Sequence, residues 1–208
     1  MNQSPVTIVI LISTVLTSLA AFQSPAFMSQ CLMSPWMIRT RKEYYRFFLS
    51  GLVHVDFIHL AVNMFVFWQF GRIVELYFHL LFQKWAALAF IALYILGIIV
   101  ADIPSYFKHR NNPGFAAIGA SGAVSAILFS FCLMNPLAKI SLYGVFPMPA
   151  VVWGLAYLLY SAWMSRRGGD RVNHDAHLYG ALFGVVFTAA LHPDFVLHFI
   201  DNLGFSSR

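Results

Sequence analysis

Charged residues are scarce in this chain, and their scarcity excludes an ordinary soluble fold. Asp, Glu, Lys and Arg make up 10% of the 208 residues, whereas 60% are hydrophobic and the mean hydropathy is +0.71. Soluble domains usually carry about 25% charged residues, so this composition indicates a polytopic membrane protein. A hydrocarbon core about 30 Å thick needs roughly 20 apolar residues per helix, which leaves room for about six spans and no soluble domain.

Cysteine pairs, charge blocks and internal repeats are also missing. Cys31 and Cys132 are the two cysteines of the sequence, and their positions fit neither a disulfide framework nor a metal site. The net charge of +5 comes from basic residues spread over short loops beside apolar runs. This arrangement favours contact with the lipid bilayer and argues against a nucleic-acid partner.

Long apolar runs are what the chain has instead. They predict an all-α, polytopic bundle of six transmembrane helices, at residues 6–22, 57–80, 85–107, 115–133, 149–164 and 174–192. No Lys or Arg precedes Arg39, so the first run lacks the charged start of a signal peptide and is interpreted as a retained span. We expect one membrane domain over residues 1–208, with a long first loop at residues 23–56.

The first loop mixes aromatic and basic side chains. Trp36, Tyr44 and Tyr45 lie among Arg39 and Arg46. This mixture is typical of a segment in the headgroup interface, whereas so many aromatic residues disfavour the alternative of a disordered loop.

Four polar residues lie near the start of alternate apolar runs. Helices alternate direction through a bilayer, so the second, fourth and sixth runs begin on the same face. His59 and Asn63 belong to the second run, Ser121 to the fourth and His177 to the sixth. All four are expected roughly 5 to 12 Å below that face. Ionisable groups within spans are usually functional, although hydrogen bonding between helices is an alternative role for His59 and Asn63.

The types of these residues suggest hydrolysis inside a bilayer. A serine hydroxyl is a weak nucleophile until a hydrogen-bonded histidine takes its proton, which makes Ser121 and His177 a candidate dyad. His59, Asn63 and the N–H of Ser121 in the first helical turn are candidate donors to the oxyanion. Asp175 points about 200° around the helix from His177 and is therefore a poor third member of a triad.

Small residues predict how the two helices meet. Gly180 and Gly184 lie on the same helix face as His177, and Ser125 follows Ser121 by one turn. Two such shallow faces allow close backbone approach, which would bring the hydroxyl and the imidazole together. Close packing alone is the alternative explanation for the small residues at 119–122.

These residues resemble a known family, the rhomboid intramembrane serine proteases in their prokaryotic six-span form. The resemblance covers roughly residues 43–193 and is carried by Gly119-Ala120-Ser121-Gly122, His59-Leu60-Ala61-Val62-Asn63 and Ala176-His177 with Gly180 and Gly184. It implies that Ser121 is the nucleophile, that His177 is the general base, and that His59, Asn63 and the Ser121 amide form an oxyanion hole. It also implies a supporting role for His54, transmembrane proteins as substrates, and no metal or organic cofactor.

Three features depart from the family pattern, and the last of them is the stretch Asn173-His174-Asp175 before His177, which is more polar than usual. The family commonly has Trp-Arg where this chain has Tyr45-Arg46, and often an aromatic residue where this chain has Ser125. The second departure leaves open what packs against His177. Because hydrolysis consumes water, we also expect a water-filled recess lined by His54, His59, Asn63, Ser121, Asn173 and His174.

The orientation in the membrane has two interpretations. Nine basic residues lie in loops on the predicted active-site face, namely Arg39, Arg41, Lys42, Arg46, Lys108, Arg110, Arg166, Arg167 and Arg171. Four lie on the other face, namely Arg72, Lys84, Lys139 and Arg208. The positive-inside rule then puts the active-site face in the cytoplasm. The resemblance instead implies a bacterial inner membrane with the site opening to the extracytoplasmic side, and this is the orientation we expect.

Three other functions are compatible with parts of the pattern. A catalytically inactive relative that binds transmembrane helices would be expected to lose Ser121 or His177, yet both are present. A small transporter would need polar groups that reach both faces, whereas the lower halves of the fourth and sixth runs are nearly all apolar. A membrane lipase usually has a Gly-x-Ser-x-Gly turn between strand and helix, and Ala123 replaces the last glycine here.

Overall fold

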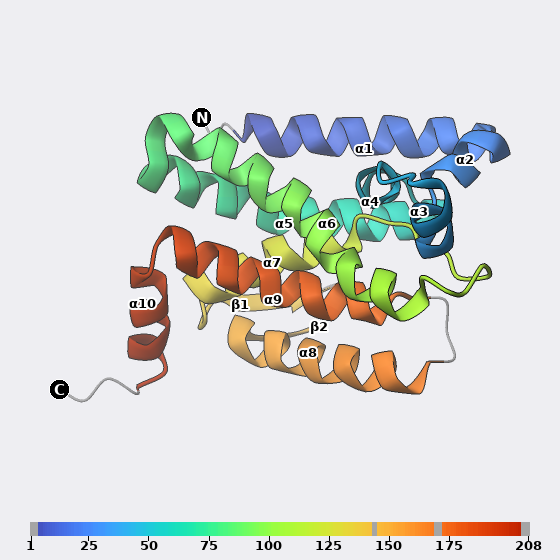
Figure 1. Cartoon of the computed structure of the whole chain (residues 1–208). Coiled ribbons are helices and arrows are strands. Elements are labelled where there is room, and N and C mark those ends of the chain that lie inside the picture. Colours follow the sequence, from blue (N-terminus) through green and yellow to red (C-terminus); the bar gives the residue numbers. More distant parts are fainter. Residues whose placement is uncertain (1–3, 143–144, 169–171, 205–208) are drawn as a thin grey trace.

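Long helices that lie side by side form the body of the protein (Figure 1). The computed structural model describes residues 4–142, 145–168 and 172–204. The long helices are α1 (Pro5–Gln23), α5 (Phe57–Phe82), α6 (Ala86–His109), α7 (Ser121–Met134), α8 (Ala150–Arg167) and α9 (His174–Leu191). They coincide with the six apolar runs of the sequence, although α7 begins six residues later than its predicted start at Phe115.

Length and composition identify two stretches that are able to cross a membrane. They are Pro5–Gln23 and the 53-residue stretch Phe57–His109, in which η2 (Gln83–Trp85) joins α5 to α6. Helix α9 and α10 (Asp194–Asn202) add a third if the pair, which is bent by 114°, counts as one span. Helix α7 is apolar but has only 14 residues.

The first loop is folded, which excludes the disordered alternative. It contains α2 (Pro25–Cys31), α3 (Pro35–Arg41), α4 (Arg46–Leu49) and η1 (Ser50–Leu52). Ser24 and Ser34 cap α2 and α3, each of which begins with proline. The buried Arg46 guanidinium donates to the carbonyls of Ser29, Gln30 and Leu32, at 2.9 Å each. Arg46 therefore ties α4 to the segment at residues 29–32.

A β-hairpin between α7 and α8 corrects the all-helical prediction. Strand β1 (Lys139–Leu142) pairs antiparallel with β2 (Val145–Pro149). Pro136, Pro147 and Pro149 disfavour a helix here, and the Ile140 side chain is buried in the main hydrophobic core. Helix α10 is a second element that the hydropathy pattern did not predict.

Helix α7 is the central helix of the fold. Every residue from Gly122 to Met134 except Leu128 is buried. Helices α5, α6, α8 and α9 all contact it. The start of α7, where Ser121 lies, is therefore held by several neighbours at once.

Two glycines of α9 allow it to lie against α7. A Cβ placed on Gly180 would come within 2.2 Å of the Gly122 carbonyl oxygen, and one on Gly184 within 2.1 Å of the Ala126 carbonyl oxygen. The shallow face of α7 thus consists of Gly122 and Ala126. The prediction that Ser125 belongs to this face is wrong, because its hydroxyl hydrogen-bonds to Tyr157 of α8 instead.

A buried carboxylate attaches α1 to α5. The Glu75 side chain accepts hydrogen bonds from the backbone N–H groups of Val6 and Thr7 and from the Thr7 hydroxyl. The first N–H groups of a helix have no partner within it, and a negative charge there also complements the helix dipole. Glu75 therefore fixes the start of α1 beside the bundle.

Replacing either contact glycine is expected to destabilise the fold. Gly180→Ala or Gly184→Ala would force a methyl group into a neighbouring backbone carbonyl, which should cost more than about 2 kcal/mol. Thermal unfolding in detergent measures this loss. Gly114→Ala is the matched control, because a Cβ there meets its nearest atom, Asn112 Oδ1, at 3.4 Å. Equal unfolding temperatures for all three variants would contradict the packing described here.

Candidate active site

The chain turns into α7 immediately before Ser121. Gly119 has φ +129°, a value that residues with a side chain rarely adopt. Its N–H donates to the Ser50 carbonyl at 2.9 Å. Ser121 is the first residue of the helix, so its N–H belongs to the first turn, whose donors have no carbonyl partner within the helix. This position is compatible with a role for that N–H as an oxyanion donor.

The loop before α7 is attached to the first loop at three points. Met33 and Ala117 exchange two backbone hydrogen bonds, at 2.9 and 3.0 Å. Gly119 is bonded to Ser50, and the Ala120 N–H donates to His54 Nε2 at 3.3 Å. The first loop therefore sets the position at which the serine helix begins.

His54 is a structural acceptor in this arrangement. Because its Nε2 accepts from Ala120, its proton is assigned to Nδ1, which lies 3.1 Å from the Ser18 hydroxyl of α1. Burial, with a smaller contribution from the charge of His59, lowers the pKa of His54 to about 3. His54 is 0% exposed, so it stabilises the loop. The prediction that it lines an open, water-filled recess is wrong.

His59 lies against the turn that leads to Ser121. Its N–H donates to the Asp56 side chain at 2.7 Å, which caps α5. A Cβ placed on Gly119 would lie 2.6 Å from His59 Cε1 and 3.0 Å from Nε2, so glycine is required for this contact. Asn63 follows one turn along α5, is 5% exposed, and donates from Nδ2 to the His59 carbonyl at 2.9 Å.

His177 lies on α9, the helix that packs against α7. A Cβ on Gly122 would lie 3.6 Å from the Ala176 carbonyl oxygen, so the residues that follow Ser121 lie beside those that precede His177. The imidazole is half-buried and stacks on the Tyr157 ring, with centroids 5.9 Å apart and an interplanar angle of 22°. The buried His174 ring meets it edge-on at 5.7 Å.

A buried polar network that sequence reasoning missed holds the start of α9. The Asn173 side chain accepts from the Ala176 N–H at 3.2 Å and from the Ser105 hydroxyl at 3.0 Å. Its Nδ2 lies 3.5 Å from Asp102 of α6, and the second carboxylate oxygen of Asp102 accepts from Ser50. Asp102 thus joins the α9 cap to the loop that binds Gly119. An aspartate inside an apolar run was the signal in the sequence.

Asp175, two residues before His177 on α9, binds side chains of α6 and α8. It forms an ion pair with Lys108 at 2.8 Å and a hydrogen bond with Ser165.

Among the basic residues counted in the sequence, Arg171 and Arg208 lie outside the described residues.

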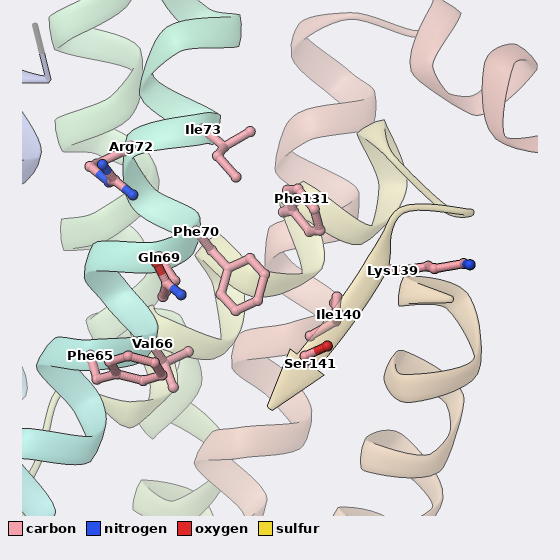
Figure 2. A pocket seen from close by; sticks show the side chains of 10 residues that line it. All are labelled: Phe65, Val66, Gln69, Phe70, Arg72, Ile73, Phe131, Lys139, Ile140 and Ser141. Carbon is pink, nitrogen blue, oxygen red and sulfur yellow. The ribbon is translucent and has the colours of Figure 1, made fainter. Parts of the chain in front are cut away.

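A separate recess of about 200 Å³ lies between α5 and β1. Figure 2 shows α5 on one side of it and the hairpin on the other. Its walls are Phe65, Val66, Gln69, Phe70, Arg72, Ile73, Phe131, Lys139, Ile140 and Ser141. The candidate site residues do not belong to this lining.

Comparison with known proteins identifies relatives of the chain. The sequence model of the Rhomboid domain matches residues 41–194. Presenilin-associated rhomboid-like protein A, mitochondrial, of Danio rerio is 31% identical over 150 residues, which cover 69% of this chain and 37% of that protein. Rhomboid protein 1, mitochondrial, of Saccharomyces cerevisiae is 32% identical over 145 residues, which cover 66% and 39%. The human presenilin-associated rhomboid-like protein, mitochondrial, is 28% identical over 148 residues, which cover 69% and 37%.

The matches cover only part of the length of each relative. The matched part of this chain spans well under half of the length of each of these relatives. Their names place them in mitochondria, whereas the family resemblance had implied a bacterial inner membrane for this chain.

The neutral state of His54 predicts a pH dependence of stability. The unfolded side chain binds a proton near pH 6.5 but the folded one only near 3, so its contribution is complete above 6.5 and is lost as the pH falls toward 3. Protonation at Nε2 removes the acceptor for the Ala120 N–H. Unfolding temperatures of the parent and His54→Gln in detergent, measured between pH 7.5 and 4.5, test this. The parent should lose more stability on acidification, and parallel pH curves would refute the assignment.

Proposed function

The chain belongs to the rhomboid family, and on that premise we propose that it is an intramembrane serine protease. Its substrates are other membrane proteins, which it cleaves in or near their transmembrane segments. The observation that carries this proposal is the meeting of α7 and α9 at Gly122 and Gly180, because it brings the Ser121 end of one helix beside the His177 end of the other.

In the proposed mechanism Ser121 and His177 act as a dyad. The Ser121 hydroxyl attacks the scissile carbonyl carbon while the His177 imidazole takes its proton. The tetrahedral intermediate then collapses, and the imidazolium gives that proton to the leaving amine. Water then enters, loses a proton to His177 and attacks the acyl ester. When the second intermediate collapses, the imidazolium returns that proton to the Ser121 oxygen, which releases the second product and restores both residues.

Three donors are proposed for the oxyanion of the intermediate. They are the Ser121 N–H, the His59 imidazole and the Asn63 side-chain amide. The contact of His59 with Gly119, and the position of Ser121 in the first turn of α7, support these roles. Donors fixed before the reaction stabilise the developing charge without reorganisation.

We further propose that all six long helices span the membrane. An intact substrate helix hides its carbonyls in backbone hydrogen bonds, so we expect cleavage at small or helix-breaking residues. The substrate enters sideways from lipid, past α8 or the first loop. The exposed outer face of α8, with Leu155, Leu159 and Trp163, is compatible with a boundary to lipid.

Loss of the dyad is expected to abolish proteolysis. Ser121→Ala and His177→Ala should each reduce cleavage of a labelled transmembrane substrate in liposomes to background, because the nucleophile or its base is gone. His59→Ala or Asn63→Ala should slow the reaction roughly 10 to 1000 fold, the effect of removing one oxyanion donor.

Two exposed residues supply matched controls for this assay. Ser13→Ala and His198→Ala remove the same functional groups far along the sequence from the site and should leave the rate unchanged. Cleavage at the parental rate by both dyad variants would exclude the proposed mechanism.

The orientation of the site follows the family in this proposal. The loop at residues 108–114, on the face where α7 begins, should be accessible from the extracytoplasmic side, and Lys84 should lie on the opposite side. Single cysteines introduced at Arg110 and Lys84, in a chain without Cys31 and Cys132, can be labelled from one side of sealed vesicles. Labelling of position 110 only from the cytoplasmic side would support the positive-inside orientation instead.

A further inference from the structure

We propose that Tyr157 of α8 is a positioning residue that holds the His177 base. This inference rests on the proposed protease function. Tyr157 belongs to α8, a helix that carries none of the candidate dyad or oxyanion residues.

Three contacts fix the Tyr157 ring. One face stacks on the His177 imidazole, with centroids 5.9 Å apart and planes inclined by 22°. Its hydroxyl lies 2.6 Å from the Ser125 hydroxyl, and the Phe129 ring lies 5.7 Å away by centroids. Ser125 and Phe129 both belong to α7, the helix that begins at Ser121. Tyr157 therefore holds the His177 side chain at a defined position relative to α7, the helix that begins at Ser121.

The size of Ser125 makes this contact possible. A small side chain at this position leaves room for a ring from α8, and its hydroxyl supplies a hydrogen-bond partner for the phenol. Buried tyrosine hydroxyls usually need such a partner. Ser125 and Tyr157 thus act as a matched pair across the α7–α8 contact.

Small residues occupy the fully buried positions of α8, and Trp153 is partly buried against the main core. Ala150, Gly154 and Ser161 are its buried positions, and they recur with Tyr157 at intervals of one helical turn. Leu155, Leu159, Tyr160 and Trp163 are all exposed. Tyr157 is a large side chain of α8 that contacts both α7, at Ser125 and Phe129, and α9, at His177, whereas Tyr160 contacts α9 at His174.

Stacking on Tyr157 restricts the orientation of the His177 imidazole, and a misaligned imidazole would slow the reaction. The half-buried imidazole has to present one nitrogen to the serine hydroxyl, and a ring against its face limits rotation of the side chain. A displacement of about 1 Å in a catalytic group can cost about 100 fold in rate. Loss of the ring should therefore reduce kcat while substrate binding is retained.

Kinetics of Tyr157 variants test the proposal. With a labelled transmembrane substrate in liposomes, Tyr157→Leu should lower kcat about 10 to 100 fold and leave KM within about 2 fold of the parent. Tyr157→Phe keeps the ring and loses only the bond to Ser125, so it should retain most of the parental kcat. Leu16→Ala, which changes a comparably exposed leucine of α1, is the matched control and should behave as the parent.

A second variant separates positioning from folding. Tyr157→Met keeps a comparable apolar volume without a planar face, and each variant is assayed below its own unfolding temperature. Low kcat in both the Leu and Met variants, with activity retained in Phe, supports the proposal. Parental kcat in the Leu or Met variant overturns it, as does an equal loss in the Phe variant. Failure of the parent to exceed Ser121→Ala overturns the protease function itself, and with it this inference.

Discussion

The close approach of α7 and α9 is the constraint on which the rest of the structure depends. At Gly180 and Gly184 the α9 backbone lies so near the α7 carbonyls that no Cβ fits. Between helices in a membrane, packing of this kind replaces the hydrophobic effect as the source of association. Because the contact begins at Gly122, directly after Ser121, it also determines which residues of α9 face the nucleophile.

Buried polar groups extend this constraint from the helices to the loops. His54 accepts a hydrogen bond from the Ala120 N–H. Asp102 connects Ser50 to the Asn173 cap of α9. Glu75 accepts hydrogen bonds from the start of α1. A polar group without a partner is expensive in a low-dielectric interior, so each of these bonds favours one arrangement of the segments that it joins. The turn before Ser121 is consequently fixed from the first loop, from α5 and from α6.

The sequence predicted those features that depend on composition and helical periodicity. The six long helices and the common face of Ser121, His59 and His177 follow from hydropathy and from 100° per residue. Contacts between helices were not predictable in the same way. Nothing local to Ser125 indicates that its partner is Tyr157, because the two meet only after α8 docks.

The β-hairpin and the polar network were missed for related reasons. The strands of the hairpin have four and five residues, which is too short to produce a clear periodic signal. Asp102 was visible as a charge in an apolar run, but its partners come from the first loop and from the α9 cap. Long-range pairing of this kind requires the fold to be known.

Covalent capture of the nucleophile is the most direct test of the central claim. A fluorophosphonate reacts with an activated serine by forming an O–P bond and releasing fluoride, and peptide mass spectrometry identifies the modified residue. The account predicts labelling at Ser121 in the purified, detergent-solubilised protein and its loss in His177→Ala. Labelling at another serine, or undiminished labelling of Ser121 without His177, would contradict a dyad formed by α7 and α9.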